Sequence, residues 1–160
     1  MNEIFILKGA KQSGKTTQLV NWVINNDDCS GILAPVIDGK RHLYSISTKQ
    51  NKELEAKFTD VDTVSIGRFV FNESVFSWGR EQLNNSLQSN KKYLVIDEIG
   101  PLEIQGKGLE PIASKILQTI WKQESISLIL VVRESLVDEV ISHFNLEGVR
   151  LINHIDELEN

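Results

Sequence analysis

Short apolar runs recur along the chain, and segments of a different pattern separate them. The run from Ile4 to Lys8 is rich in β-branched residues and stops at Gly9, which predicts a buried strand followed by a loop. The runs Tyr93 to Ile96 and Ile126 to Val132 predict two further buried strands, and Val149 to Ile152 predicts a last one.

Helical periodicity fills much of the sequence between these runs. Apolar residues fall on one face of four predicted helices: Leu19, Val20, Val23 and Ile24 in a helix that starts near Gly14; Phe76, Leu83 and Leu87; Ile112, Ile116, Leu117 and Ile120; and Leu136, Val137, Val140, Ile141 and Phe144. The tryptophans Trp22, Trp78 and Trp121 lie in or beside these faces and are predicted to be core residues. Strands that alternate with helices predict an α/β fold, in which a mostly parallel sheet carries helices on both faces.

Residues 31–71 interrupt this alternation with short strand-like pieces, among them Ile32-Leu33 and Val36-Ile37. Turn residues at Asp38-Gly39 and near Gly67 predict an antiparallel hairpin insertion. The polar stretch from Lys49 to Phe58 predicts a loop or a short helix. No repeat or Pro/Gly-rich linker marks a boundary in the 160 residues, so we expect residues 1–160 to form a single domain.

Composition narrows the classes of function and the compartment. A net charge of -5 argues against a general nucleic-acid binder, which would carry a basic face. The single cysteine, Cys29, excludes an intrachain disulfide and favours a cytoplasmic protein. No apolar stretch approaches the ~18 residues of a membrane span, so no membrane association is expected.

The segment Gly9-Ala10-Lys11-Gln12-Ser13-Gly14-Lys15-Thr16 fits the phosphate-binding pattern G-x-x-x-x-G-K-[ST]. It lies between a predicted buried strand and a predicted helix, where loop N–H groups and the helix dipole both attract phosphate. Lys15 is expected to reach the β- and γ-phosphate oxygens, and the Thr16 hydroxyl to coordinate Mg²⁺. The sequence therefore predicts a nucleoside triphosphate site formed by residues 9–16 and the adjacent Thr17.

A second acidic site follows the strand Tyr93 to Ile96. Asp97 at its carboxyl end is expected to hold Mg²⁺, and Glu98 to orient and partly deprotonate the water that attacks the γ-phosphate. The alternative is that the two carboxylates only cap the turn at Gly100-Pro101. The phosphate-binding loop favours the catalytic interpretation.

The loop at Gly9 to Thr16, together with Asp97-Glu98-Ile99-Gly100-Pro101-Leu102-Glu103, resembles the small P-loop nucleoside-triphosphatase family that includes the cancer-related and thermophilic NTPases. Weaker similarities are found at Gly31, Gly39-Lys40-Arg41, Gly67-Arg68-Phe69 and Val131-Val132-Arg133. The resemblance implies a P-loop fold of the RecA-like (ASCE) type and slow, Mg²⁺-dependent hydrolysis of ATP, GTP and related substrates to the diphosphate and phosphate. The family's usual T-x-E-V-R is replaced by Ala34-Pro35-Val36-Ile37-Asp38, which leaves base and partner specificity open.

Phosphoryl transfer leaves charge on the γ-phosphate oxygens that an arginine can neutralise. Arg41, Arg68 and Arg133 are the candidates near predicted loops or strand ends, and Arg68 is preferred because Gly67-Arg68 resembles a family position. We therefore predict Lys15, Arg68 and Glu98 as catalytic residues.

Two other functions remain open at this level. A nucleoside or nucleotide kinase would use the same loop, with Glu98 accepting a proton from an acceptor hydroxyl. A nucleotide-dependent switch or assembly protein would use hydrolysis as a timer and bind a protein partner through residues 31–71.

Overall fold

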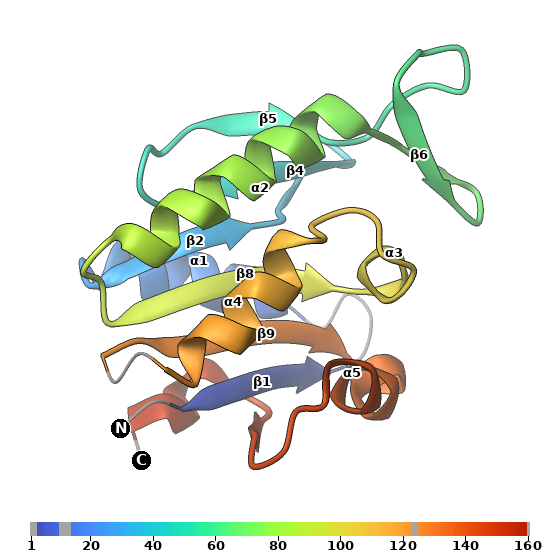
Figure 1. Cartoon of the computed structure of the whole chain (residues 1–160). Helices are drawn as coiled ribbons and strands as arrows, with labels where there is room; N and C mark the ends of the chain where they lie inside the picture. Colours follow the sequence, from blue (N-terminus) through green and yellow to red (C-terminus); the bar gives the residue numbers. More distant parts are fainter. Residues whose placement is uncertain (1–2, 10–13, 123–124, 160) are drawn as a thin grey trace.

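The computed structural model describes residues 3–9, 14–122 and 125–159 (Figure 1). In this part of the chain, eight strands form one sheet in the order β10-β1-β9-β8-β2-β4-β3, with β5 paired to β4. From β10 to β2 all pairings are parallel, whereas β3, β4 and β5 pair antiparallel. The strands are β1 (Ile4–Gly9), β2 (Cys29–Leu33), β3 (Val36–Ile37), β4 (Lys40–Ser45), β5 (Asn51–Glu53), β8 (Tyr93–Ile99), β9 (Ser127–Arg133) and β10 (Arg150–Ile152).

Helices cover both faces of the sheet, as Figure 1 shows for α2 and α4 in front and α1 behind. Alternate residues of the central strands point to opposite faces, so Ile6 packs on the side of α2 and α4 while Leu7 packs on the side of α1. The helices are α1 (Lys15–Ile24), α2 (Glu73–Gln88), α3 (Pro101–Ile104), α4 (Ile112–Ile120) and α5 (Val137–Phe144), with 3₁₀ turns η1 (Glu134–Leu136) and η2 (Ile155–Glu159). The predicted α/β class, with a mostly parallel sheet, is confirmed.

The predicted helical faces are buried in α2 and α4, where every predicted apolar residue lies in the core. In α1 the prediction is wrong at its end, because Ile24 is 71% exposed. Trp121 was expected in the core and is also exposed, since it follows the last turn of α4. None of the helices in the described part of the chain combines the length and hydrophobicity of a bilayer span.

The antiparallel region begins later than the sequence indicates. Ile32 and Leu33 belong to β2, which runs parallel to β8 inside the main sheet and also borders β4. The turn at Asp38-Gly39 joins β3 to β4 as predicted, and both residues have positive φ. The turn at Gly67 joins a separate two-stranded sheet, β6 (Thr63–Ile66) and β7 (Phe69–Asn72), which stands apart from the main sheet at the upper right of Figure 1.

The polar stretch from Lys49 to Phe58, predicted as a loop or a short helix, is a loop on either side of a short strand. Asn51–Glu53 form β5, and its three exposed residues pair with β4 from His42 to Tyr44. The main-chain pairing rather than side-chain burial fixes this strand, so its sequence carries no apolar alternation.

Candidate active site

The phosphate-binding motif connects β1 to α1 at the carboxyl edge of the parallel sheet. Gly9 ends β1, Gly14 adopts a left-handed conformation with φ of 82°, and the helix begins at Lys15. Ala10, Lys11, Gln12 and Ser13, which are predicted to bind nucleotide, lie outside the described residues. The strand, loop and helix order around the motif is therefore the one that the phosphate-binding pattern requires.

Asp97 lies beside the start of α1, near the carboxyl end of β8. The Thr16 hydroxyl donates to Asp97 Oδ2 over 2.9 Å, and the backbone N–H of Ala34 donates to the same oxygen over 2.9 Å. Asp97 is only 2% exposed, and its Oδ1 is a buried atom with no hydrogen-bond partner among the described residues. Burial raises the pKa of Asp97 to about 6, although the Ala34 N–H opposes this rise.

A buried carboxylate oxygen without a partner is costly, and such atoms call for a specific explanation. The Oδ1 atom and the adjacent Thr16 hydroxyl are hard oxygen donors of the kind that Mg²⁺ prefers. In the described part of the chain, no group of three or more His, Cys, Asp or Glu side chains could hold a metal ion alone. The donor set therefore fits Mg²⁺ bound jointly with phosphate oxygens, as is usual for this ion.

Glu98 occupies an irregular point in β8. Between Ile96 and Ile99 the pairing with β9 shifts register, and Glu98 has a φ of 70°. A non-glycine residue in this region is strained, and such strain is concentrated at functional sites. The irregularity lets Asp97 point into the buried site while Glu98 lines the cavity beside it.

Two arginines hold the Glu98 carboxylate. Arg41 Nη1 lies 2.7 Å from Glu98 Oε2, and Arg133 Nη2 lies 3.7 Å from Oε1. Arg41 comes from β4 and also donates to the carbonyl oxygen of Ala34 over 2.7 Å, whereas Arg133 ends β9. Two of the three candidate arginines thus converge on the proposed catalytic carboxylate.

These groups surround one cavity of about 440 Å³, which we call the phosphate pocket. Its lining includes the described residues of the predicted nucleotide site together with both acidic residues and two arginines: Gly9, Gly14, Lys15, Thr16, Thr17, Arg41, Asp97, Glu98 and Arg133. Desolvation lowers the pKa of Lys15, and the nearby Glu134 opposes this effect. Cation and hydroxyl groups thus gather in a pocket of suitable size for a ligand.

Arg68 occupies a different position. It lies in the exposed turn between β6 and β7, with its guanidinium carbon 5.2 Å from the centre of the Phe69 ring. It lines a second cavity and is not among the residues around the phosphate pocket. The catalytic role assigned to Arg68 from the sequence stays a prediction.

The sequence did not identify the Ala34 backbone as part of the site. Ala34 directly follows β2, and its N–H reaches Asp97 because β2 lies next to β8 in the sheet. Ala34-Pro35 had been noted only as a departure from a family motif. The contact of the Ala34 N–H with Asp97 could have been predicted only with the pairing of β2 and β8 known.

Comparisons with known proteins indicate the family to which the chain belongs. The chain matches the family described as NTPase over residues 4–157. No significant match was found among curated protein sequences.

Two solved structures share the fold. The crystal structure of THEP1 from the hyperthermophile Aquifex aeolicus superposes with a TM-score of 0.74 at 18% identity, covering 98% of this chain and 92% of that one. The solution structure of a human cancer-related nucleoside triphosphatase gives 0.64 at 16% identity, covering 96% and 88%. The three folds therefore agree over nearly the whole length of this chain. Because the family match covers residues 4–157, the chain belongs to the NTPase family of P-loop nucleoside triphosphatases.

Proposed function

We propose that this protein hydrolyses a nucleoside triphosphate of the ATP or GTP type to the diphosphate and phosphate, with Mg²⁺, and that Glu98 activates the attacking water. The observation that carries the proposal is the 2.9 Å hydrogen bond from Thr16 to Asp97, which brings the end of the phosphate-binding motif to the residue next to Glu98. One pocket can therefore serve the phosphates, the metal and the water together.

Each described residue has a role that its chemistry supports. Lys15 binds the β- and γ-phosphate oxygens, while Gly9, Gly14 and Thr17 form the described parts of the loop wall. Thr16 and Asp97 Oδ1 hold Mg²⁺, which when bound neutralises charge on the phosphate oxygens. Residues 10–13 of the motif lie outside the described residues, and on the sequence pattern they are proposed to donate their backbone N–H groups to the phosphates.

Glu98 is the proposed general base. It lines the phosphate pocket beside Asp97, so a water between Glu98 and the γ-phosphorus lies within hydrogen-bond reach of the carboxylate. The water oxygen forms a bond to phosphorus, the bond to the bridging oxygen of the diphosphate breaks, and the water proton passes toward Glu98. Inorganic phosphate and the nucleoside diphosphate are the products.

Arg41 and Arg133 are better placed than Arg68 to neutralise charge on the γ-phosphate. Both line the phosphate pocket and both contact Glu98. An arginine that exchanges its carboxylate partner for a phosphate oxygen would stabilise the transition state and release Glu98 to accept a proton.

The direct test is phosphate release from a panel of ATP, GTP, CTP and UTP, with and without Mg²⁺ and without any added acceptor. Hydrolysis predicts equal amounts of diphosphate and phosphate that depend on Mg²⁺. A kinase would instead form diphosphate only when an acceptor is supplied, and that result would overturn the proposal. The same panel reports the preferred base.

A second function is favoured by one surface feature. Phe58 and Val61 are 83% and 82% exposed in the segment that leads into β6. Large exposed apolar side chains near one another suit a protein contact, as expected for a nucleotide-dependent switch. Hydrolysis would then accelerate when the partner binds, and the double substitution Phe58→Ser with Val61→Ser should abolish that acceleration without changing the basal rate.

A further inference from the structure

A second cavity, of about 480 Å³, adjoins the phosphate pocket. Arg41, Asp97, Glu98 and Arg133 line both cavities. Much of the rest of the second cavity is formed by the β6–β7 hairpin, the first turn of α2 and the segment from Ile99 to Leu109 around α3. Figure 1 shows the hairpin and α3 at the same end of the molecule, where the parallel strands end.

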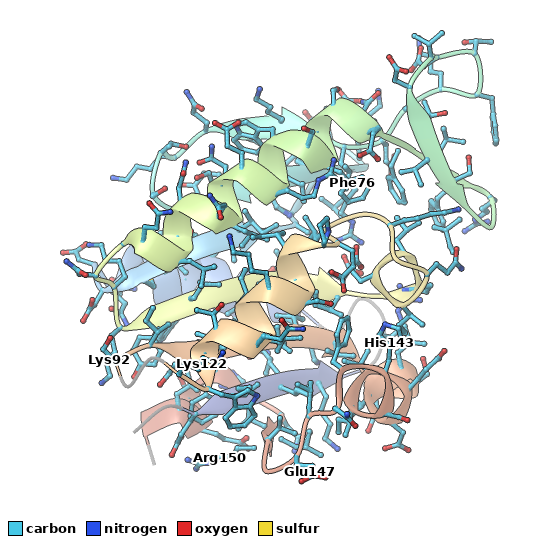
Figure 2. All side chains as sticks on the ribbon, viewed as in Figure 1. Phe76, Lys92, Lys122, His143, Glu147 and Arg150 are labelled. Carbon is cyan, nitrogen blue, oxygen red and sulfur yellow. The ribbon has the colours of Figure 1, made fainter. Side chains whose placement is uncertain are left out.

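The walls of this second cavity are mainly apolar, with three aromatic rings. Phe69 and Phe71 lie nearly parallel with centroids 6.1 Å apart, and Phe76 meets Phe71 edge-on at 6.0 Å. Phe76, labelled in Figure 2, comes from the end of α2 next to the hairpin. Aliphatic side chains complete the lining: Leu43, Leu54, Ile66, Leu102, Leu109 and Leu136. A cavity of this volume with a largely apolar wall and a set of charged side chains is typical of a small-molecule site.

The charged groups of the second cavity indicate the chemistry of its ligand. Glu98 is paired with Arg41 and Arg133, and Glu103 accepts hydrogen bonds from the backbone N–H groups of Gly100 and Leu109. Glu55 also lines this cavity. Arg68 is exposed at the hairpin turn, and within the described residues no carboxylate lies at ion-pair distance from it. Its guanidinium is therefore available to an acidic group, with which it can form a bidentate contact.

Hydrolysis alone does not account for this second cavity. The attacking nucleophile is one water, which needs about 30 Å³, whereas the cavity beside Glu98 is more than ten times larger. An apolar wall with aromatic rings also offers a water few hydrogen-bond partners.

We propose that the second cavity is a binding site for a planar aromatic small molecule that carries an acidic group. The aromatic rings of the ligand pack against Phe69, Phe71 and Phe76, and its acidic group pairs with Arg68. The ligand lies beside Glu98 but outside the phosphate pocket, so it binds together with a nucleotide. This site goes beyond the proposed hydrolysis and does not depend on it.

The probe for this site is 8-anilinonaphthalene-1-sulfonate, an aromatic anion whose fluorescence rises on transfer to an apolar site. It is titrated into the full chain that is already saturated with ADP and Mg²⁺, so that the phosphate pocket is blocked. One probe should bind per chain. Arg68→Ala should weaken binding roughly tenfold through the lost charge-assisted contact, and Phe69→Ala roughly fivefold through the lost ring contact.

Lys57→Ala is the matched control because it removes an exposed positive charge from the segment before β6, outside the cavity lining. It should bind the probe with the parent affinity. Arg68 and Phe69 are both exposed, so their variants should keep the parent unfolding temperature, measured by circular dichroism.

Three results would overturn the site: no saturable binding, displacement of the probe by ADP, or equal affinities of Arg68→Ala and Lys57→Ala. Loss of ATP hydrolysis with this binding pattern intact would instead reject the proposed function and leave the second site standing.

Discussion

Arg41 Nη1 lies 2.7 Å from Glu98 Oε2, and the same guanidinium nitrogen donates to the carbonyl oxygen of Ala34 over 2.7 Å. The residue proposed to activate water is therefore held by a cation that comes from the antiparallel edge of the sheet. Under the proposed mechanism, this ion pair has to reorganise when the γ-phosphate binds.

The first prediction concerns the three arginines. Arg41→Ala and Arg133→Ala should each lower kcat roughly 100-fold, since each removes a positive charge that lines the phosphate pocket. Arg68→Ala should lower kcat much less, because Arg68 does not line the phosphate pocket. Steady-state phosphate release by the three variants measures which of these arginines contributes to catalysis. A larger loss in Arg68→Ala than in the other two would restore the assignment made from the sequence.

The second prediction concerns the metal. Thr16→Ala and Asp97→Asn should each raise the Mg²⁺ concentration that gives half-maximal rate, because each removes an oxygen donor proposed to bind the ion. Thr17→Ala is the control, since Thr17 lines the pocket without a contact to Asp97. A Mg²⁺ titration of the hydrolysis rate measures the effect. An unchanged Mg²⁺ dependence in Thr16→Ala would contradict its role as a ligand.

The third prediction concerns the close approach of β2 and β8. Gly31 has a φ of 114°, and a Cβ added there would collide with the carbonyl oxygen of Val95. Gly31→Ala should therefore lower the free energy of unfolding by about 3 kcal/mol, from overpacking and backbone strain together. Gly148→Ala has no atom within 4 Å of the added Cβ and tests the strain of positive φ alone. Urea unfolding should show a clearly smaller loss for Gly148→Ala.

The fourth prediction concerns Glu103. Its carboxylate accepts hydrogen bonds from the backbone N–H groups of Gly100 and Leu109 in the segment after β8. Burial raises its pKa from 4.5 to about 7. Between these values the folded protein keeps a proton that the unfolded chain has released, so the stability that this group contributes is full below about pH 4.5 and is lost as the pH rises to 7. The loss is on the order of 3 kcal/mol.

Glu103→Gln should remove this dependence. Urea unfolding at pH 5 and pH 7.5 should show a fall in stability for the parent that the variant lacks. Glu139→Gln, at an exposed position of α5, should behave as the parent does. Parallel stability profiles for the parent and Glu103→Gln would show that Glu103 does not titrate in this range.

Much of the sheet could be predicted because its central strands are continuous apolar runs that end at chemically distinctive residues. The ends of β1 and β8 meet at one edge of a parallel sheet, so the proximity of Thr16 and Asp97 followed from the predicted fold. The position of Ile32 and Leu33 in the parallel part of the sheet could not be predicted in this way. An apolar run of this length does not reveal whether its partner strand is parallel or antiparallel.

The contacts of Arg41 and Arg133 with Glu98 could not be predicted from the sequence for a related reason. Arg41 reaches Glu98 only because the hairpin of β3 and β4 pairs Val36 with Arg41 and lies beside β2. Such non-local pairing leaves no local pattern. Arg68 was the preferred candidate because Gly67-Arg68 resembles a family position, yet its hairpin forms a separate sheet.

The central claim is that Glu98 activates water, and Glu98→Gln tests it most directly. The substitution keeps the size of the side chain and one oxygen that can accept from Arg41, but it removes the base. We predict that kcat for ATP falls at least roughly 100-fold, while the Kd for ATP with Mg²⁺, measured by calorimetry, stays within a factor of about three. Hydrolysis by Glu98→Gln at the parent rate would contradict the account.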